Sequence, residues 1–260
     1  MHNINHCPSC HSTNCVLTPG RLARFVVWQI IGSDPESNVP TQLLHCKDCD
    51  FICSQTRFTP EEEQALYTDY RGEVYNQRRV TCEPEYQTHI DSYNFEAELE
   101  GRKLGIDYLI TQHLDPLAVN TVLDYGGNDG AFIPHYFFNA TKYVYDISGN
   151  QPVEGVLPYN KDTGPKPVDV IMCCHTLEHL SDPDIVLNDI KELVSSGSYA
   201  YFEVPVERAN YNHPYSENLF HEHINMFHEQ SLEALLTRHN FEIVETFRYT
   251  HLLCILTKIK

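Results

Sequence analysis

The sequence has 260 residues, 42% of them hydrophobic, which is enough to bury a full core. No stretch approaches the roughly 18 apolar residues of a membrane span, and the initial MHNINHCPSC lacks an export signal, so we expect a cytoplasmic globular protein without a membrane span. The formal net charge of −18 argues against nucleic acid as the main partner, because a phosphate-binding surface needs clustered Lys and Arg.

Cysteines are concentrated near the amino terminus. Six of the ten lie within the first 53 residues, and four of these form two Cys-x2-Cys pairs. Each pair can place two thiolates on one ion, and four thiolates complete a tetrahedral structural zinc site. The predicted zinc ligands are Cys7, Cys10, Cys46 and Cys49, with Cys15, Cys53, His6, His11 and His45 close enough in sequence to replace one of them. Free buried thiols are the alternative.

The segment that contains these pairs is expected to form a small zinc ribbon. Its apolar runs RFVVWQII and QLLHC, residues 24–31 and 42–46, are predicted strands, and so small a module needs metal to fold. A helix start follows, with Thr59 as the cap, Pro60 at the first helical position and a glutamate three residues after the cap. We therefore assign residues 1–58 to a zinc-binding module.

Residues 59–94 are predicted to form a helical or lid segment. The run LYTDYRGEVYNQRR places Arg71, Arg78 and Arg79 among tyrosines. Because guanidinium groups bind carboxylates and phosphates bidentately, these arginines are candidates for holding an anionic substrate. A solvated helix with a tyrosine face is the alternative.

A glycine-rich turn lies at residues 121–131, TVLDYGGNDGA, which predict a strand, a sharp turn and the start of a helix. Gly126, Gly127 and Gly130 can adopt positive φ and let a ligand approach the backbone, while a helix start offers unpaired N–H groups. A dinucleotide-binding turn would have glycine in place of Asn128. A tight turn that binds no ligand is a further alternative.

Strands and helices alternate around and after this turn. Helices are predicted at residues 95–113, 184–194 and 231–239, and strands at 142–146, 168–173, 199–204, 241–249 and 252–259. Such alternation predicts an α/β fold with a parallel sheet covered by helices on both faces. The last two strands are nearly consecutive, so they are expected to form an antiparallel hairpin.

This order of elements resembles the Rossmann-like fold of class I S-adenosylmethionine-dependent methyltransferases, whose seven-stranded sheet has one antiparallel strand. Four residues carry the match to that family's motif I: Leu123, Asp124, Gly126 and Gly130. Asn128 replaces the middle glycine of the motif. VDVIMCCHTLEHLSDP, residues 168–183, is similar to the family's fourth strand and the segment after it. The resemblance covers residues 95–260 and implies S-adenosylmethionine as the cofactor.

The resemblance also implies which residues contact the cofactor. Asp146, 22 residues after Asp124 (146 − 124), would accept hydrogen bonds from the ribose hydroxyls. The implied cofactor-binding residues are Asp124, Gly126, Gly127, Asn128, Gly130, Asp146, Ile147, His175 and Leu177. For Glu178 and His179, a structural pair that fixes the loop is the alternative to a place at the pocket edge.

The segment NLFHEHINMFHEQSLEALLTRHNFEIVE resembles a region of the subgroup that carries an amino-terminal zinc module and acts on sugars or other small metabolites. Sugar C-methyltransferases of that subgroup use a Tyr-His-Glu-His motif for the catalytic base, and the aligned residues here are Phe220, His221, Glu222 and His223. The missing tyrosine argues against carbon methylation, whereas a histidine, with an ordinary pKa of about 6.5, suits an oxygen or nitrogen nucleophile. The predicted catalytic set is His221, Glu222 and His223, with His223 as the base oriented by Glu222. A His-Glu-His run that only hydrogen-bonds a loop is the alternative.

The sequence therefore predicts a zinc-containing methyltransferase that acts on a small metabolite, such as a nucleotide-linked sugar or a glycan precursor, including phosphate-bearing ones. A non-catalytic binding module, in which the side chain of Asn128 blocks the cofactor turn, is the competing hypothesis. A nicotinamide oxidoreductase is disfavoured by the spacing of the turn and by the terminal hairpin.

Overall fold

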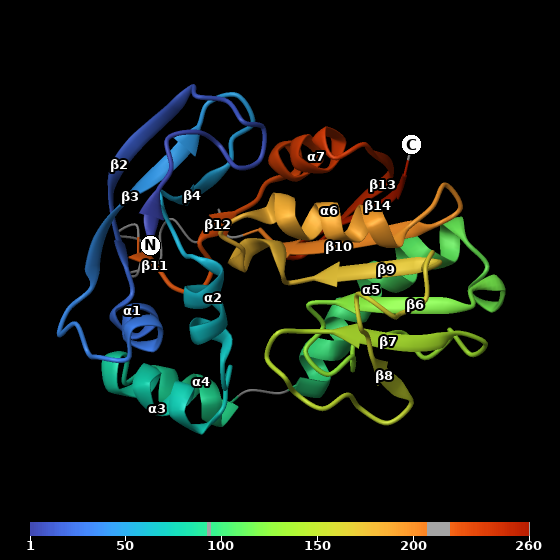
Figure 1. Ribbon diagram of the computed structural model, residues 1–260, viewed down its shortest axis with the longest axis horizontal. Helices are drawn as coiled ribbons and strands as arrows, with labels where there is room; N and C mark the ends of the chain where they lie inside the picture. Colours follow the sequence, from blue (N-terminus) through green and yellow to red (C-terminus); the bar gives the residue numbers. More distant parts are fainter. Residues whose placement is uncertain (93–94, 207–218, 260) are drawn as a thin grey trace.

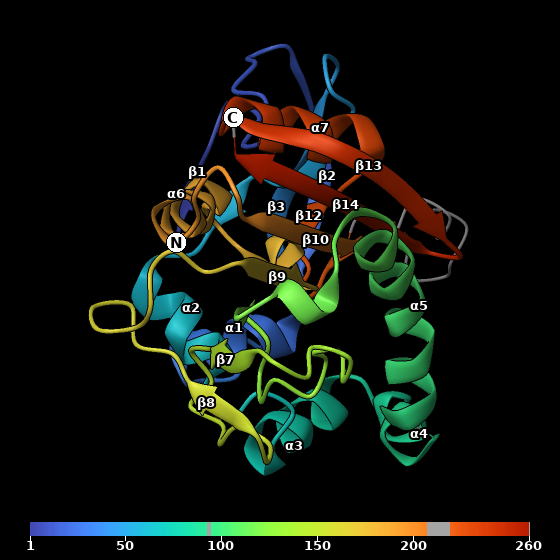
Figure 2. The same ribbon diagram turned by 90° about the vertical axis from the view of Figure 1, so that its right-hand side faces the viewer.

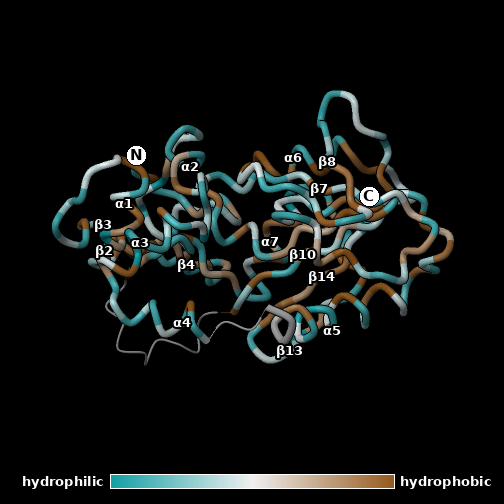
Figure 3. The backbone as a smooth tube through the Cα atoms, turned by 90° about the horizontal axis from the view of Figure 1, so that it is seen from below, coloured by the Kyte–Doolittle hydropathy of each residue, from teal (hydrophilic) through white to brown (hydrophobic). Residues whose placement is uncertain are grey.

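A computed structural model describes residues 1–92, 95–206 and 219–259. Figure 1 shows a smaller amino-terminal part beside a larger part built on one sheet, and Figure 3 shows the same arrangement from below. No helix within these ranges is long and apolar enough to cross a membrane.

The larger part is organised around a seven-stranded sheet with the order β13-β14-β10-β9-β6-β7-β8. Its strands are β6 (Thr121–Tyr125), β7 (Thr141–Tyr145), β8 (Val156–Pro158), β9 (Val170–Cys174), β10 (Tyr199–Pro205), β13 (Phe241–Tyr249) and β14 (Leu252–Ile259). β14 is antiparallel to both of its neighbours, and the other neighbouring pairs are parallel. The predicted α/β sheet with its terminal hairpin is confirmed.

Helices cover both faces of this sheet, as predicted. One face packs against α5 (Phe95–His113) through Ile106, Leu109 and Ile110. The opposite face packs against α6 (Pro183–Leu193) and α7 (Glu229–Arg238), and Figure 2 shows α5 and α6 on opposite sides of β9 and β10. The carboxyl ends of the parallel strands, where ligands bind in such folds, face the amino-terminal part (Figure 1).

The predicted helix after the glycine turn is absent. Residues 131–140, all of them described, form successive turns and bends between β6 and β7. Pro134 lacks the N–H that a continuing helix needs, and the aromatic residues around it are weak helix formers. A ligand at this turn would therefore meet N–H groups of the turn itself and no helix terminus.

The amino-terminal part contains a five-stranded sheet with the order β11-β2-β3-β4-β12, in which two strands come from far along the chain. β11 (Leu219–Phe220) pairs with β2 (Cys15–Leu22), and β12 (Asn225–Met226) pairs with β4 (Ile52–Ser54). The central strand is β3 (Val39–Cys46), and β1 (His2–Asn3) pairs separately with β5 (Thr56–Arg57). Residues 219–226 thus join the two parts, and a module boundary at residue 58 stays a prediction.

The RFVVWQII run forms helix α1 (Arg24–Ile31) and not the predicted strand. A short apolar run does not distinguish a buried strand from a buried helix. Here Gly32 adopts a φ of 74° and donates its N–H to the carbonyl of Trp28, which is a left-handed helix cap. The QLLHC run lies in β3, as predicted.

Three helices occupy the segment after the amino-terminal sheet strands. α2 (Pro60–Tyr67) begins at the predicted position, with a capping box between Thr59 and Glu62. α3 (Glu73–Cys82) and α4 (Tyr86–Ser92) follow. Two short 3-10 helices, η1 (Pro116–Ala118) and η2 (Leu177–His179), lie in the larger part.

Candidate functional site

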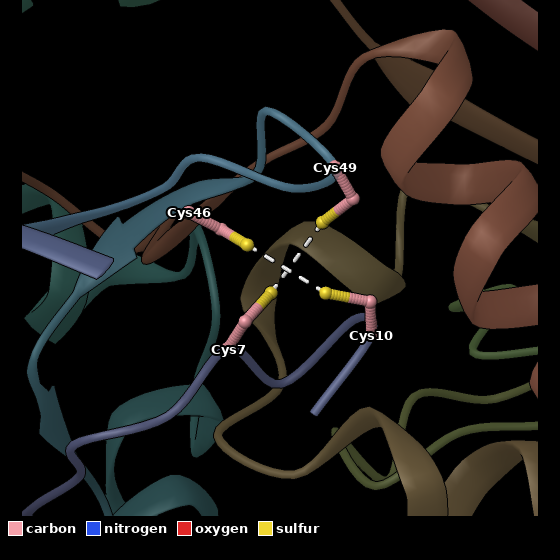
Figure 4. Close-up of side chains that lie close together, drawn as sticks. All are labelled: Cys7, Cys10, Cys46 and Cys49. Carbon is pink, nitrogen blue, oxygen red and sulfur yellow. Dashed lines mark hydrogen bonds between the residues drawn. The ribbon is translucent and has the colours of Figure 1, made fainter. Parts of the chain in front are cut away.

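The four cysteines predicted to bind zinc converge on one point (Figure 4). The Sγ atoms of Cys7 and Cys49 are 3.6 Å apart, as are those of Cys10 and Cys46. A tetrahedron with zinc–sulfur bonds of about 2.3 Å has edges of about 3.8 Å, so the donor set fits a structural zinc ion. Their ligand atoms all lie within 4.8 Å of one another. The described residues thus bring together the four first-choice ligands.

This cysteine centre is part of the main hydrophobic core. Cys7 and Cys46 are fully buried, in the same cluster as residues of the seven-stranded sheet and α7. Arg238 of α7 donates from Nε to the carbonyl of Ser9 and from Nη2 to that of Pro8, both at 2.9 Å. Asp184 accepts from Nη1 of the same guanidinium at 2.9 Å. These hydrogen bonds attach the backbone of the first cysteine loop to α7 of the larger part.

The glycine turn wraps over a buried acid. Gly126 and Gly130 have φ values of 75° and 79°, and Asn128 has a φ of 57°. Asparagine tolerates this left-handed region, which is why it can stand where the family motif has glycine. A Cβ at Gly127 would lie 2.1 Å from Cγ of Asp124, so only glycine lets the turn approach this carboxylate.

Asp124 is the unusual group of this turn. Its side chain is fully buried, and neither carboxylate oxygen has a hydrogen-bond partner among the described residues. Burial, opposed by the charge of Arg102, raises the pKa of Asp124 to about 7. A buried carboxylate without a partner is costly, so this site fits a ligand that brings a positive group, such as an amino-acid ammonium.

The other residues predicted to contact the cofactor lie around this turn with different exposure. Asp146 accepts hydrogen bonds from the N–H of Asn128 at 2.8 Å and from the N–H of Ser148 at 2.7 Å. Ile147 is 43% exposed, whereas the side chain of Leu177 is fully buried in the core. The acid at the end of β7 is thus held beside the glycine turn by backbone N–H groups.

His175 lies between two buried acids. Its φ is 49°, a strained conformation for a residue with a Cβ. Nε2 is 3.2 Å from Glu203, and Nδ1 is 3.4 Å from Glu178. Glu203 also accepts from Arg102 at 2.8 Å. Although burial opposes its ionisation, the hydrogen bond from His175 and the charge of Arg102 lower the pKa of Glu203 to about 2.

A cavity of about 230 Å³ is lined by side chains of α3 and of the segment 219–226, and it contains the predicted catalytic residues. It is lined by Arg79, Leu219, His221, Glu222, His223 and Met226. The carboxylate of Glu222 accepts from Nη1 of Arg79 at 2.8 Å and from the hydroxyl of Tyr75 at 3.1 Å. Although burial opposes ionisation, Arg79 and then His223 and His221 hold the pKa of Glu222 below its usual value. We name this space the acceptor cavity.

The acceptor cavity also draws on residues that the sequence did not single out as catalytic. Phe220, at the position of the family's tyrosine, is fully buried in β11, and Tyr75 of α3 supplies a hydroxyl to Glu222 instead. The ring of His179 lies 4.5 Å from that of His223, and its Nδ1 is 3.2 Å from the carbonyl of Glu222. The tyrosine-rich run at residues 66–79, which continues into α3, was the sequence signal for Tyr75. Packing alone brings His179 next to His223.

The predicted lid arginines are engaged with the protein itself. Arg79 also bonds Glu83 at 3.4 Å, and Arg78 donates to Gln29 at 2.7 Å. The guanidinium of Arg71 lies 5.2 Å from the ring centre of Tyr70. Arg79 therefore compensates a buried carboxylate of the chain, and anion binding by the segment stays a prediction.

A family profile described as a methyltransferase domain matches residues 99–246, which is more than half of the chain. The chain belongs to this methyltransferase family. It is an S-adenosylmethionine-dependent methyltransferase. No curated protein matches the sequence.

Several solved methyltransferase structures are similar to parts of the chain at low sequence identity. A type 11 methyltransferase from Sulfolobus solfataricus is 18% identical, with 54% of this chain and 84% of that chain covered and a TM-score of 0.43. A methyltransferase from Aquifex aeolicus is also 18% identical, covering 62% and 97%, with a TM-score of 0.41. Magnesium protoporphyrin IX methyltransferase from Synechocystis PCC 6803 is 12% identical, covering 72% and 99%, with a TM-score of 0.45.

Proposed function

We propose that this methyltransferase methylates an oxygen or nitrogen atom of a small metabolite, a nucleotide-linked sugar or a glycan precursor, with His223 as general base. The observation that supports this most directly is the acceptor cavity, whose lining includes His221, Glu222 and His223. A cavity of about 230 Å³ is smaller than the roughly 300–1,000 Å³ of sites for drug-sized ligands. It therefore suits a single sugar-sized group.

The lining of the cavity supports a polyhydroxylated acceptor. Arg79, His221 and Glu222 offer hydrogen-bonding groups, and Leu219 and Met226 offer apolar surface. A sugar presents hydroxyl groups at its rim and C–H groups on its faces, so it needs both kinds of contact. Because Arg79 is already paired with Glu222 and Glu83, recognition of a phosphate in this cavity would need another cation.

His223 suits the task of removing the acceptor proton. It lines the cavity next to His179. Burial, and then the charge of His223, lower the pKa of His179 well below its ordinary value, which favours a neutral ring for His179. Glu222 precedes His223 in the chain, and the charges of these two side chains interact. A positioned base of this kind typically contributes 10²- to 10⁴-fold to the rate.

We propose further that Asp124 and Asp146 hold the amino group and the ribose of the cofactor at the glycine turn. Calorimetric titration with S-adenosylmethionine and S-adenosylhomocysteine tests this assignment. Asp146→Ala should weaken the binding of both ligands by at least tenfold, because the two hydrogen bonds from the ribose hydroxyls to this carboxylate are lost. Asp129→Ala, in the same turn, is the matched control. Equal affinities for the Asp146 variant and the wild type would refute the assignment.

The four-cysteine centre is proposed to hold a structural zinc ion. Its closed donor set leaves no position for a substrate, so its role is to fix the first cysteine loop against α7. Metal analysis of protein never exposed to chelator should find one zinc per chain. A content far below one would refute the site.

Acceptor identity is tested with methyl-labelled S-adenosylmethionine and a panel of nucleotide-linked sugars, with the free nucleotides, free sugars and simple amines as controls. Label should appear on the sugar of a nucleotide-linked sugar. His223→Ala should lower turnover at least 100-fold with unchanged cofactor affinity, whereas the exposed His135→Ala should not. Labelling of only non-sugar acceptors would refute the acceptor class, and an active His223 variant would refute the base.

A further inference from the structure

Glu178 is a buried acid that the proposed reaction has not yet used. It lies in η2, directly after the carboxyl end of β9, and its side chain is 1% exposed. His175 Nδ1 lies 3.4 Å and His179 Nε2 lies 4.0 Å from its Oε1. Glu178, His179 and His223 each place a polar side-chain atom within 4.8 Å of those of the other two. The acid therefore adjoins the proposed base and its neighbouring ring.

Basic side chains lie next to each of the three buried glutamates of this region. Glu203 has the guanidinium of Arg102 at 2.8 Å, and Glu222 has that of Arg79 at 2.8 Å. Glu178 is placed among imidazoles, whose charge depends on a proton. A buried carboxylate stabilises a nearby positive charge strongly, because little solvent screens the pair.

The orientation of the His179 ring determines which of its nitrogens carries the hydrogen. Its Nδ1 is 3.2 Å from the backbone carbonyl of Glu222, so this nitrogen carries the hydrogen. Its Nε2, which then carries no hydrogen, lies 4.0 Å from Oε1 of Glu178. The carboxylate interacts more favourably with a cationic group than with this neutral ring nitrogen. A positive charge on the ring of His223 would lie close to this carboxylate.

We propose that Glu178 is a positioning residue for methyl transfer, whose buried charge orients His179 and stabilises the imidazolium form of His223. This inference rests on the proposed role of His223. During transfer the acceptor atom forms its bond to the methyl carbon, the carbon–sulfur bond breaks with its electron pair moving to sulfur, and the acceptor proton passes to His223. Glu178 gains no proton in this step; it stabilises the charge that His223 gains.

Several other groups act on the same histidine and must be held constant in a test. Among the described residues, Glu178 and His179 lie near His223, and His221 and Glu222 are in its own segment. The charged and titratable groups next to these are His175 beside Glu178, Arg79 beside Glu222, Glu83 beside His221, and Tyr67 and Tyr70 beside His179. A variant that changes only Glu178 isolates its contribution.

The experiment follows the histidine rings by nitrogen-15 NMR as a function of pH, which needs no acceptor. Glu178→Gln keeps the size of the side chain and removes its charge, and His223→Gln assigns the resonance. The titration midpoint of His223 should fall by about one pH unit or more in Glu178→Gln. Glu229→Gln removes a charge from the surface of α7, where Glu229 is 46% exposed, and should leave the midpoint unchanged.

Three results would overturn the proposal. One is an unchanged His223 midpoint in a folded Glu178→Gln protein. Another is a second metal ion per chain, beyond the zinc, that is lost in Glu178→Gln, because an ion would then supply the positive charge. If Glu178→Gln does not fold, the wild-type protein decides, and a His179–His223 pair that stays unprotonated down to about pH 5 contradicts a stabilising acid. Because none of these measurements involves turnover, a wrong acceptor class or an active His223→Ala variant would be seen separately.

Discussion

Two buried carboxylates near the carboxyl edge of the sheet differ in their hydrogen-bond partners and in the direction of their pKa shifts. Glu222 is paired with Arg79 and Tyr75, and its pKa lies below the usual value. Asp124 has no hydrogen-bond partner within the described ranges, and burial raises its pKa to about 7. The charge of Glu222 is balanced by side chains of the protein, so this acid has a structural role. The charge of Asp124 is not balanced by a hydrogen-bonding group of the described residues, as expected for an acid that binds a cationic ligand.

The cysteine centre is a further buried anionic site, whose charge would be balanced by a bound metal ion. Loss of this centre should reduce the stability of the protein most. Cys46→Ser removes one of the four proposed zinc ligands from a core position. Structural zinc supplies about 10–16 kcal/mol of binding free energy in zinc-finger peptides, so we expect loss of the ion and of cooperative unfolding. Circular dichroism and metal analysis measure both. Cys15→Ser should keep the zinc; its loss in both variants would assign the ligands differently.

Breaking the completed pair should have the next largest effect. Arg79→Ala leaves the carboxylate of Glu222 buried without its guanidinium, which costs about 3–5 kcal/mol in comparable cases. Urea unfolding should show this loss, and Glu222→Gln in the same chain should restore part of it. Arg78→Ala, which removes a partner of the neutral Gln29, is the matched control. Equal losses for the two arginine variants would contradict a special role for the pair.

Replacing Asp124 should increase the stability of the cofactor-free protein, which is opposite to the effect expected for Arg79→Ala. The folded-state pKa of about 7 for Asp124 exceeds the unfolded value of 3.8, so the folded chain binds more protons between these values and loses stability as pH rises from about 4 to 7. Asp124→Asn should abolish this decline and stabilise the cofactor-free protein by up to about 4 kcal/mol at pH 8, while weakening S-adenosylmethionine binding. Thermal unfolding across pH measures the first effect and calorimetry the second. A parallel decline in both proteins would contradict the assignment.

The turn over Asp124 offers the smallest and most specific test. Asn128→Gly relieves a left-handed conformation at a gain of about 1 kcal/mol or less and loses the contact between the side chains of Asn128 and Asn150. Because the backbone N–H of residue 128 still reaches Asp146, cofactor affinity should change less than threefold. Asn240→Gly, at a φ of 63°, is the control for stability alone. A large gain in affinity for Asn128→Gly would show that the asparagine obstructs the site.

The parts of the fold that follow from short-range pattern were predictable. The terminal hairpin has the predicted bounds, because two apolar strands separated by two residues leave no other arrangement. The apolar run at Arg24–Ile31 was wrongly predicted as a strand, since only the left-handed cap at Gly32 decides for helix. The helix expected after Gly130 was also wrong, because Pro134 and its aromatic neighbours outweigh the motif.

The site divides in the same way. Cys7, Cys10, Cys46 and Cys49 share one chemistry and a fixed spacing, so the sequence identifies them together. The acceptor cavity combines unlike residues from separate elements, and the proximity of His179 to His223 is a result of packing. Arg79 was predicted to hold an anion, but the anion next to it is Glu222 of the same chain. Sequence gives the residue types here, and tertiary structure chooses their partners.

The two strands that join the parts, β11 and β12, also constrain the order of assembly. The amino-terminal sheet borrows residues 219–226, so during synthesis its edges stay unpaired until most of the chain has left the ribosome. A zinc ion at the proposed site could bind the cysteine loops much earlier, since all four proposed ligands lie before residue 50. A nascent chain would therefore hold its metal first and close its acceptor cavity last, and the long-range pairing makes that closing step slow.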